Sequence, residues 1–174
     1  LAGNRPAKLI PTTDFADPVH YYCKAPSKTS DIPLFNSVLY ELSYRLENKL
    51  QKNVQIKKAT NKMPFGGIYI DKIPMEVNID SLVISELEKL FEDLTDKNTV
   101  DSIKSKWISY EMEQTSNNYG LVTMLSDSFT ETNNAENFAA DYVLVCNATE
   151  KDFRTMIKFI LYNEIMSVYS TERK

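Results

Sequence analysis

The stretch DIPLFNSVLYELSYRLENKL, residues 31–50, contains the clearest helical pattern of the chain and is the starting point for its fold. Apolar residues recur every three or four positions, which is the period of one helix face. Either Asp31 or Ser30 is suited to cap the helix, and Pro33 fits its first turn. The sequence therefore predicts a helix over residues 33–50 with one buried stripe, formed by Phe35, Val38, Leu39, Leu42, Leu46 and Leu50.

The segment before this helix is rich in proline. Five of the seven prolines of the chain lie in residues 1–33. Prolines at this density forbid a long helix and weaken central strands, because each one lacks a backbone N–H group. We therefore expect residues 1–32 to form a Pro-rich N-terminal arm with one short strand, Val19–Lys24, and residues 33–174 to form a single α+β domain.

Beyond the first helix, the patterns predict a hairpin, two helices, two short strands and a last helix. The expected strands are Val54–Ala59, Ile68–Val77, Tyr119–Met124 and Tyr142–Cys146, and the expected helices are 80–94, 99–116 and 150–169. Residues 61–67, with Gly66 and Gly67, are expected to form a turn, and the polar stretch 126–137 a loop. This order differs from the βαβ alternation of a doubly wound sheet. We therefore expect an α+β fold with a mixed or antiparallel sheet of four to five strands and about four helices packed mainly on one face.

Composition excludes several classes of protein. The chain has 174 residues, of which 43% are apolar and 25% charged, as in an ordinary globular domain. Its net charge of −4 argues against a domain that coats duplex nucleic acid. No apolar run reaches about 18 residues, so no membrane span is expected. The two cysteines, Cys23 and Cys146, allow one disulfide or none, and the cellular compartment stays open.

Few residues are suited to catalysis. His20 is the only histidine and lies in the Pro-rich arm, which is a poor place for a rigid base. It forms an H-x-x-C pair with Cys23, whereas a structural zinc site needs four ligands. Carboxylate pairs on the predicted helices are expected to be solvated. The best candidates for a hydrolytic metal site are Asp71, Glu76 and Asp141, and we predict no cofactor.

Charge is distributed in two blocks of opposite sign. Residues 48–70 contain five lysines and no acidic residue, whereas residues 76–101 contain eight acidic residues and two lysines. The lysines of this basic patch are Lys49, Lys52, Lys57, Lys58 and Lys62. They can guard a strand edge against unwanted pairing, or join an acidic face of another copy. A third interpretation places nucleic acid on the hairpin, with Phe65 and Tyr69 as stacking groups.

The predicted last helix has more apolar residues than one core stripe requires. Phe159, Tyr162, Met166 and Tyr169 lie beyond that stripe, and aromatic residues and methionine are enriched at protein interfaces. We therefore predict a non-enzymatic interaction or assembly module, a subunit or adaptor of a larger complex. Its partners would be other copies or other proteins, which contact the last helix, the arm and the opposed basic and acidic faces. The alternatives are a carboxylate- and metal-dependent hydrolase and a nucleic-acid binder that uses the Lys49–Lys62 hairpin.

Overall fold

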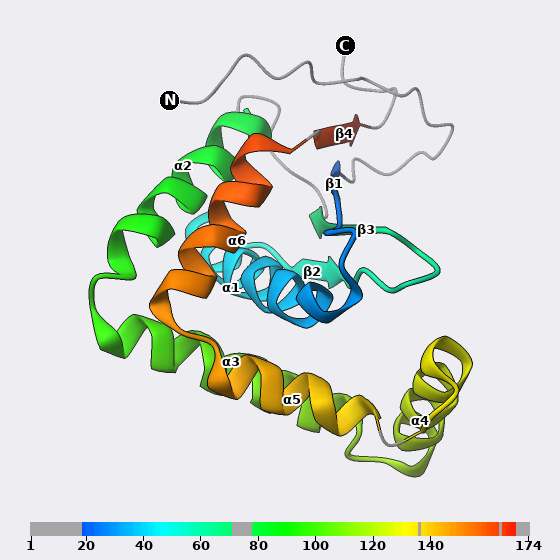
Figure 1. The fold of residues 1–174 in the computed structure, drawn as a ribbon. Helices are drawn as coiled ribbons and strands as arrows, with labels where there is room; N and C mark the ends of the chain where they lie inside the picture. Colours follow the sequence, from blue (N-terminus) through cyan, green and yellow to red (C-terminus); the bar gives the residue numbers. More distant parts are fainter. Residues whose placement is uncertain (1–18, 71–77, 136, 164, 170–174) are drawn as a thin grey trace.

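The computed structural model describes residues 19–70, 78–135, 137–163 and 165–169 (Figure 1). Six α-helices make up most of this described part, and four short strands form one sheet. In chain order the elements are β1 (Val19–Lys24), α1 (Ile32–Leu50), β2 (Val54–Lys57), β3 (Phe65–Ile70), α2 (Ile79–Asp93), α3 (Lys97–Gln114), α4 (Asn118–Thr132), α5 (Asn137–Asn147), α6 (Glu150–Tyr162) and β4 (Ile165–Tyr169). None of the described helices is both long enough and apolar enough to cross a membrane.

The sheet is antiparallel throughout, with the strand order β2-β3-β1-β4. Strand β1 has the predicted bounds, Val19–Lys24, and lies between β3 and β4. In this register Tyr22 is opposite Gly67 of β3 and Met166 of β4. A strand expected within the arm is therefore an interior strand of the sheet. Residues 1–18 lie outside the described residues, and the predicted boundary at residue 32 stays a prediction.

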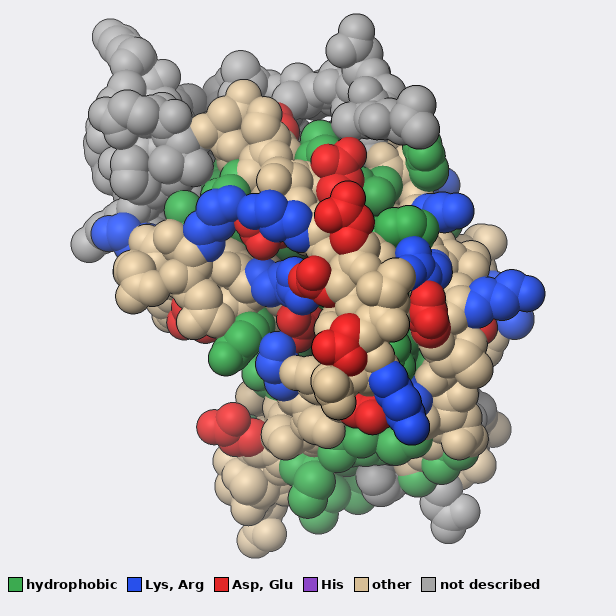
Figure 2. All heavy atoms as spheres, turned by 90° about the vertical axis from the view of Figure 1, so that its left-hand side faces the viewer, with side chains coloured by type: hydrophobic (Ala, Val, Ile, Leu, Met, Phe, Trp, Pro, Cys, Tyr) green, Lys and Arg blue, Asp and Glu red, His purple; other side chains and the backbone are tan. Residues whose placement is uncertain are grey.

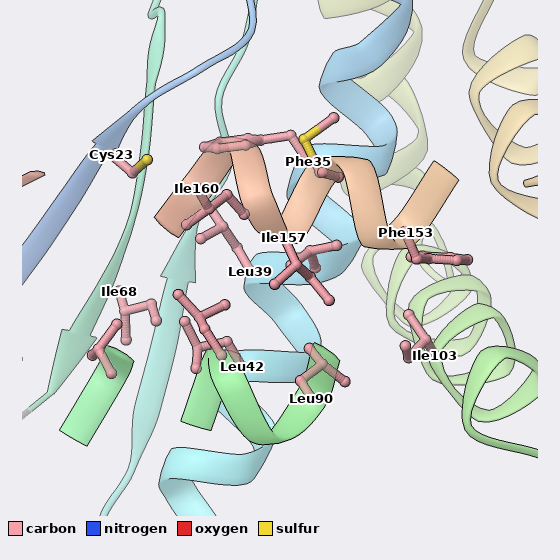
Figure 3. Close-up of a cluster of buried hydrophobic side chains, with 14 of the residues drawn as sticks. Cys23, Phe35, Leu39, Leu42, Ile68, Leu90, Ile103, Phe153, Ile157 and Ile160 are labelled. Carbon is pink, nitrogen blue, oxygen red and sulfur yellow. The ribbon is translucent and has the colours of Figure 1, made fainter. Parts of the chain in front are cut away.

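Helix α1 is the centre of the core. It packs against β2 and β3 and also contacts α2, α3, α5 and α6. Figure 3 shows Phe35, Leu39 and Leu42 of α1 gathered with Ile68 of β3 and Ile157 of α6. All five side chains are at most 2% exposed. Full burial of one such side chain contributes about 1.5–3 kcal/mol, so these five residues make a large contribution to stability. The predicted stripe of α1 is confirmed from Phe35 to Leu46.

The predicted fold class was wrong. The described chain is mostly helical, with six helices rather than about four. The expected strands 119–124 and 142–146 lie in α4 and α5, and most of the expected loop 126–137 belongs to α4. Short apolar runs cannot distinguish a strand from a helix by periodicity alone. Local polar groups decide here, because the side chain of Asn117 accepts a 2.7 Å hydrogen bond from the Gly120 N–H and caps α4.

The last helix is also shorter than predicted. Its N-terminus is the expected capping box, in which Thr149 and Asp152 each bond the other's backbone N–H. The predicted helix covered residues 150–169, whereas α6 ends at Tyr162 and residues 165–169 form the strand β4. The Asn163 side chain donates a 2.6 Å hydrogen bond to the carbonyl oxygen of Lys24 and so ties the end of α6 to β1. The following residues are then aligned with β1 as a strand.

The hairpin differs from the prediction at its glycines. Gly66 and Gly67 lie inside β3 and not in a turn. A Cβ atom on Gly67 would collide with the carbonyl oxygen of Tyr21 in β1, so this close approach of two strands requires glycine. The predicted end of the second strand, residues 71–77, lies outside the described residues.

Candidate protein-binding site

The predicted basic patch is divided between ion-paired and unpaired lysines. Lys49 lies 2.7 Å from the carboxylate of Glu86, and Lys58 lies 2.9 Å from that of Glu111. Both carboxylates are buried, which corrects the expectation that the helical carboxylate pairs are solvated. Within the described residues no ion pair involves the other three lysines of the patch, which are Lys52, Lys57 and Lys62.

The pair between Lys49 and Glu86 connects the two charge blocks inside one molecule. Glu86 also accepts a 3.2 Å hydrogen bond from Lys89. Burial alone would raise the pKa of Glu86, but the hydrogen bonds from the two lysines outweigh burial and lower the pKa below its ordinary value. Figure 2, which faces the α2 side of the molecule, shows basic and acidic side chains interspersed rather than a face of one sign.

A second network of charges holds three helices together. Glu41 of α1 is only 3% exposed and lies 3.0 Å from Arg45 and 2.8 Å from Lys106 of α3. The Arg45 guanidinium also forms an ion pair with Asp93 at the end of α2, with 2.7 Å between Nη1 and Oδ2. Sequence reasoning missed this network, although Glu41 and Arg45 have the four-residue spacing of a helical ion pair. Its role is structural, because every charge in it is paired within the molecule.

The face of the sheet that points away from α1 carries a pocket of about 210 Å³. Side chains alternate along a strand. Tyr21 and Cys23 therefore enter the core while Tyr22 is on the opposite face. The Lys57 amine lies 5.9 Å from the centre of the Tyr22 ring, within the range of a cation–π contact. The residues around the pocket are Tyr22, Gln55, Ile56, Lys57, Ile68 and Tyr69. An amine, an amide and two phenols together suit the carboxylate of an incoming acidic side chain.

Strand β2 is an edge of the sheet, next to this pocket. Among the described strands, β2 pairs with β3 alone. The second edge of such a strand can pair with an added polypeptide. A buried side chain fixes the end of β2: Asn36 of α1 donates a 3.0 Å hydrogen bond to the Ala59 carbonyl and accepts a 2.8 Å bond from the Ala59 N–H. The backbone just beyond the edge strand is therefore held to helix α1.

The four residues predicted to bind partners do not share one helix face. Phe159 and Tyr162 are in α6, with 36% and 67% exposure, whereas Met166 and Tyr169 are in β4. The Phe159 ring packs edge-on against Phe35, with 6.4 Å between ring centres. The structure thus separates the predicted surface into two parts.

The other predicted site residues are dispersed. His20 is in β1, and both cysteines are free, with Cys23 buried and Cys146 exposed. Asp141 is exposed in α5, and Asp71 and Glu76 fall in the segment 71–77, outside the described residues. Within the part of the chain that the structure describes, no cluster of three or more His, Cys, Asp or Glu residues could hold a metal ion.

Comparison with solved structures shows a fold shared with peptidases. A protease from Helicobacter pylori matches with a TM-score of 0.69 and 11% identity, over 95% of this chain and 44% of that one. A protein from Alicyclobacillus acidocaldarius assigned as an M16-like peptidase matches with a TM-score of 0.61 and 13% identity, over 94% and 43% of the two chains. The inactive peptidase domain of a Bordetella parapertussis protein assigned as a zinc protease matches with a TM-score of 0.62 and 13% identity, over 94% and 95%.

These matches show the fold alone. The chain spans less than half of the length of the first two proteins and nearly all of the third. No protein-family model matches the chain, and a search of curated proteins finds no similar sequence.

Proposed function

We propose that this chain is a non-catalytic domain of the M16-like peptidase fold that binds an extended polypeptide along the edge strand β2. The main support for this proposal is that the pocket lined by Tyr22, Lys57 and Tyr69 lies beside the edge strand β2. A peptide added to β2 would gain main-chain hydrogen bonds from the edge, and one of its side chains would enter the pocket. This refines the predicted interaction module by naming a surface and a class of partner.

The absence of catalysis is argued from the residues of the chain. The two zinc-peptidase motifs H-E-x-x-H and H-x-x-E-H each require two histidines. The single histidine, His20, is followed by Tyr21, Tyr22, Cys23 and Lys24, so these 174 residues cannot supply either motif. The donor set therefore does not fit a zinc centre of this kind. The shared fold with an inactive peptidase domain supports the same conclusion.

The chemistry of the pocket favours acidic polypeptides. Lys57 is exposed and contributes a positive charge that no ion pair of the described residues uses. A carboxylate from the bound chain would pair with this amine while its backbone pairs with β2. A charged hydrogen bond in a partly covered site is worth about 1.5–3 kcal/mol, enough to select acidic segments.

The test uses fluorescein-labelled, reduced and carboxymethylated α-lactalbumin, which is acidic and permanently unfolded. We expect its fluorescence anisotropy to rise as the purified chain is added, and its band on a denaturing gel to stay intact. Lys57→Glu should weaken this binding by about tenfold, because it places a negative charge at the pocket. Lys52→Glu is the matched control, because it changes the charge equally without lining the pocket.

Other outcomes would overturn the proposal. No rise in anisotropy, or equal losses in the two lysine variants, would exclude polypeptide binding at this pocket. Cleavage of the labelled protein that is abolished by a chelator would favour the alternative, a metal-dependent hydrolase.

A further inference from the structure

The edge strand β2 presents two different sides to an added polypeptide. Gln55 and Lys57 are exposed, whereas Ile56 between them is half-buried. Because side chains alternate along a strand, Gln55 and Lys57 lie on the outer face with the pocket, and Ile56 lies on the face toward α1. The pairing of Ile56 with Ile68, which is 2% exposed, agrees with this placement. The edge therefore has a polar side and an apolar side.

On the polar side, the pocket lies next to a strand position without a side chain, Gly67. In the sheet register Lys57 is opposite Gly67 of β3, which is in turn opposite Tyr22 of β1. The Tyr22 ring lies over this glycine, since its Cδ1 atom would be 2.9 Å from a Cβ on Gly67. The Lys57 amine approaches the same ring to 5.9 Å from its centre. The neighbouring row, Gln55 opposite Tyr69, lines the same pocket, which therefore begins at two alternate residues of the edge strand.

A polypeptide paired with β2 would continue this alternation. Residues directly opposite each other on paired strands have their side chains on the same face, with Cβ atoms about 4.5–5.5 Å apart. The residue opposite Lys57 and the residue opposite Gln55 would therefore both extend over the outer face. The residue between them would lie beside Ile56 on the other face, where an apolar side chain covers the exposed part of Ile56.

We propose that β2 selects polypeptides in which acidic and apolar residues alternate, as in Glu-Val-Glu, over polypeptides in which acidic residues follow one another. This inference rests on the proposed function and adds the sequence pattern of the ligand. One carboxylate pairs with Lys57, which forms no ion pair with any described residue, and the next accepts a hydrogen bond from the Gln55 amide. A run of acidic residues places a carboxylate beside Ile56, because neighbouring residues of a strand point to opposite faces.

Two peptides of identical composition test this pattern, each labelled with fluorescein at its N-terminus. The alternating peptide is Gly-Ser-Glu-Val-Glu-Val-Glu-Ser-Gly, and the run peptide is Gly-Glu-Glu-Glu-Ser-Gly-Val-Val-Ser. Fluorescence anisotropy is measured as the full 174-residue chain is added. We expect the dissociation constant of the run peptide to be higher by at least about fivefold. Ile56→Thr keeps a β-branched residue on the strand and should reduce this difference to less than about twofold.

An exchange of charges tests the part that Lys57 plays. Lys57→Glu should bind the alternating peptide at least about tenfold more weakly than the unchanged chain does. It should bind the counterpart with lysine in place of glutamate, Gly-Ser-Lys-Val-Lys-Val-Lys-Ser-Gly, at least about tenfold more tightly than the unchanged chain does. Lys52→Glu is the matched control, because it changes the charge equally without lining the pocket.

The outcomes separate this inference from the proposed function. Equal affinities for the two acidic peptides, or a preference that persists in Ile56→Thr, would overturn the inference. If unfolded α-lactalbumin still bound, the proposed function would stand and only the sequence pattern would be wrong. If neither α-lactalbumin nor either acidic peptide bound, or if Lys52→Glu and Lys57→Glu had equal effects, the proposed function itself would be wrong.

Discussion

Lys49 and Glu86 are joined by a 2.7 Å hydrogen bond between the Nζ and Oε1 atoms, although they come from sequence blocks of opposite charge. The bond connects the C-terminal end of α1 with the middle of α2. It lowers the positive charge that the basic patch presents to solvent, as the pair between Lys58 and Glu111 does. A nucleic-acid surface that uses all five lysines would have to break both pairs, which argues against that alternative.

The pH dependence of stability should report on Glu86. Its pKa is lowered in the folded state from the ordinary 4.5, so ionised Glu86 adds stability that is present above about pH 4.5 and is lost as the pH falls through the folded pKa. Glu86→Gln should cost about 1 kcal/mol at pH 7, and the cost should shrink at acid pH. Urea unfolding of the variant and the unchanged protein, from pH 7 to pH 3, measures this cost and its decrease at acid pH. Glu88→Gln, an exposed neighbour, is the control, and equal curves for the two variants would contradict this role.

Substitution of Asn36 should lower the stability of the fold more than substitution of most other polar residues. Asn36→Ala leaves the buried N–H and carbonyl of Ala59 without the partners they have on α1. We expect a loss of about 2–4 kcal/mol in the free energy of unfolding, because two buried backbone groups lose their hydrogen bonds. Asn48→Ala removes one exposed hydrogen bond on the same helix and should change stability by less than about 0.5 kcal/mol. Similar urea midpoints for the two variants would show that Ala59 finds other partners.

Gly67→Ala should be more harmful than Gly66→Ala. A Cβ on Gly67 meets the backbone of Tyr21, which cannot move without breaking the pairing of β1 and β3. A Cβ on Gly66 would come 2.6 Å from Cε1 of Phe35 and 2.7 Å from Cδ1 of Leu39, both of which are side-chain atoms that can shift. We expect Gly66→Ala to lower the free energy of unfolding by about 1–3 kcal/mol, and Gly67→Ala to lower it further. Thermal unfolding of the two variants measures both losses. The reverse order would mean that the strands separate more easily than the core repacks.

The sequence predicts an element correctly where its apolar repeat extends over several turns, or where the residues that define its end are close together in the chain. Helix α1 and its stripe span five turns, and the capping box at Thr149 depends on residues three positions apart. Strand β4 could not be predicted in this way, since the helical pattern of α6 continues into Ile165 and Val168. Only pairing with β1, more than 140 residues earlier in the chain, makes this segment a strand.

The candidate site could also be predicted only in part, because its residues are far apart in the sequence. Composition alone shows that the five lysines form a basic block. Their partners do not follow from it, because Glu86 is 37 residues from Lys49 and Glu111 is 53 residues from Lys58. The pocket likewise combines side chains from three strands, whose order the sequence leaves open. Lys57 could thus be assigned to a basic edge from the sequence, whereas its position over the Tyr22 ring required the fold.

Tyr110 should ionise later than an ordinary tyrosine. Its ring packs 4.5 Å from that of Tyr40 and 5.6 Å from that of Trp107, measured between centres. Burial, followed by the nearby charge of Glu111, raises the pKa of Tyr110 from 10.0 to about 12. Because the unfolded chain ionises this group first, the stability that it adds is complete below pH 10 and is lost as the pH rises toward 12.

The titration of tyrosine absorbance at 295 nm tests this prediction directly. Subtracting the curve of Tyr110→Phe from that of the unchanged protein should leave one group with a midpoint near pH 12. Tyr162→Phe, which removes one phenol from a side chain that is 67% exposed, is the control for the loss of a tyrosine as such. A difference curve for Tyr110 that is centred near pH 10 would mean that its ring is open to water, and that the contact between α1 and α3 at Tyr40 and Trp107 is looser than the structure shows.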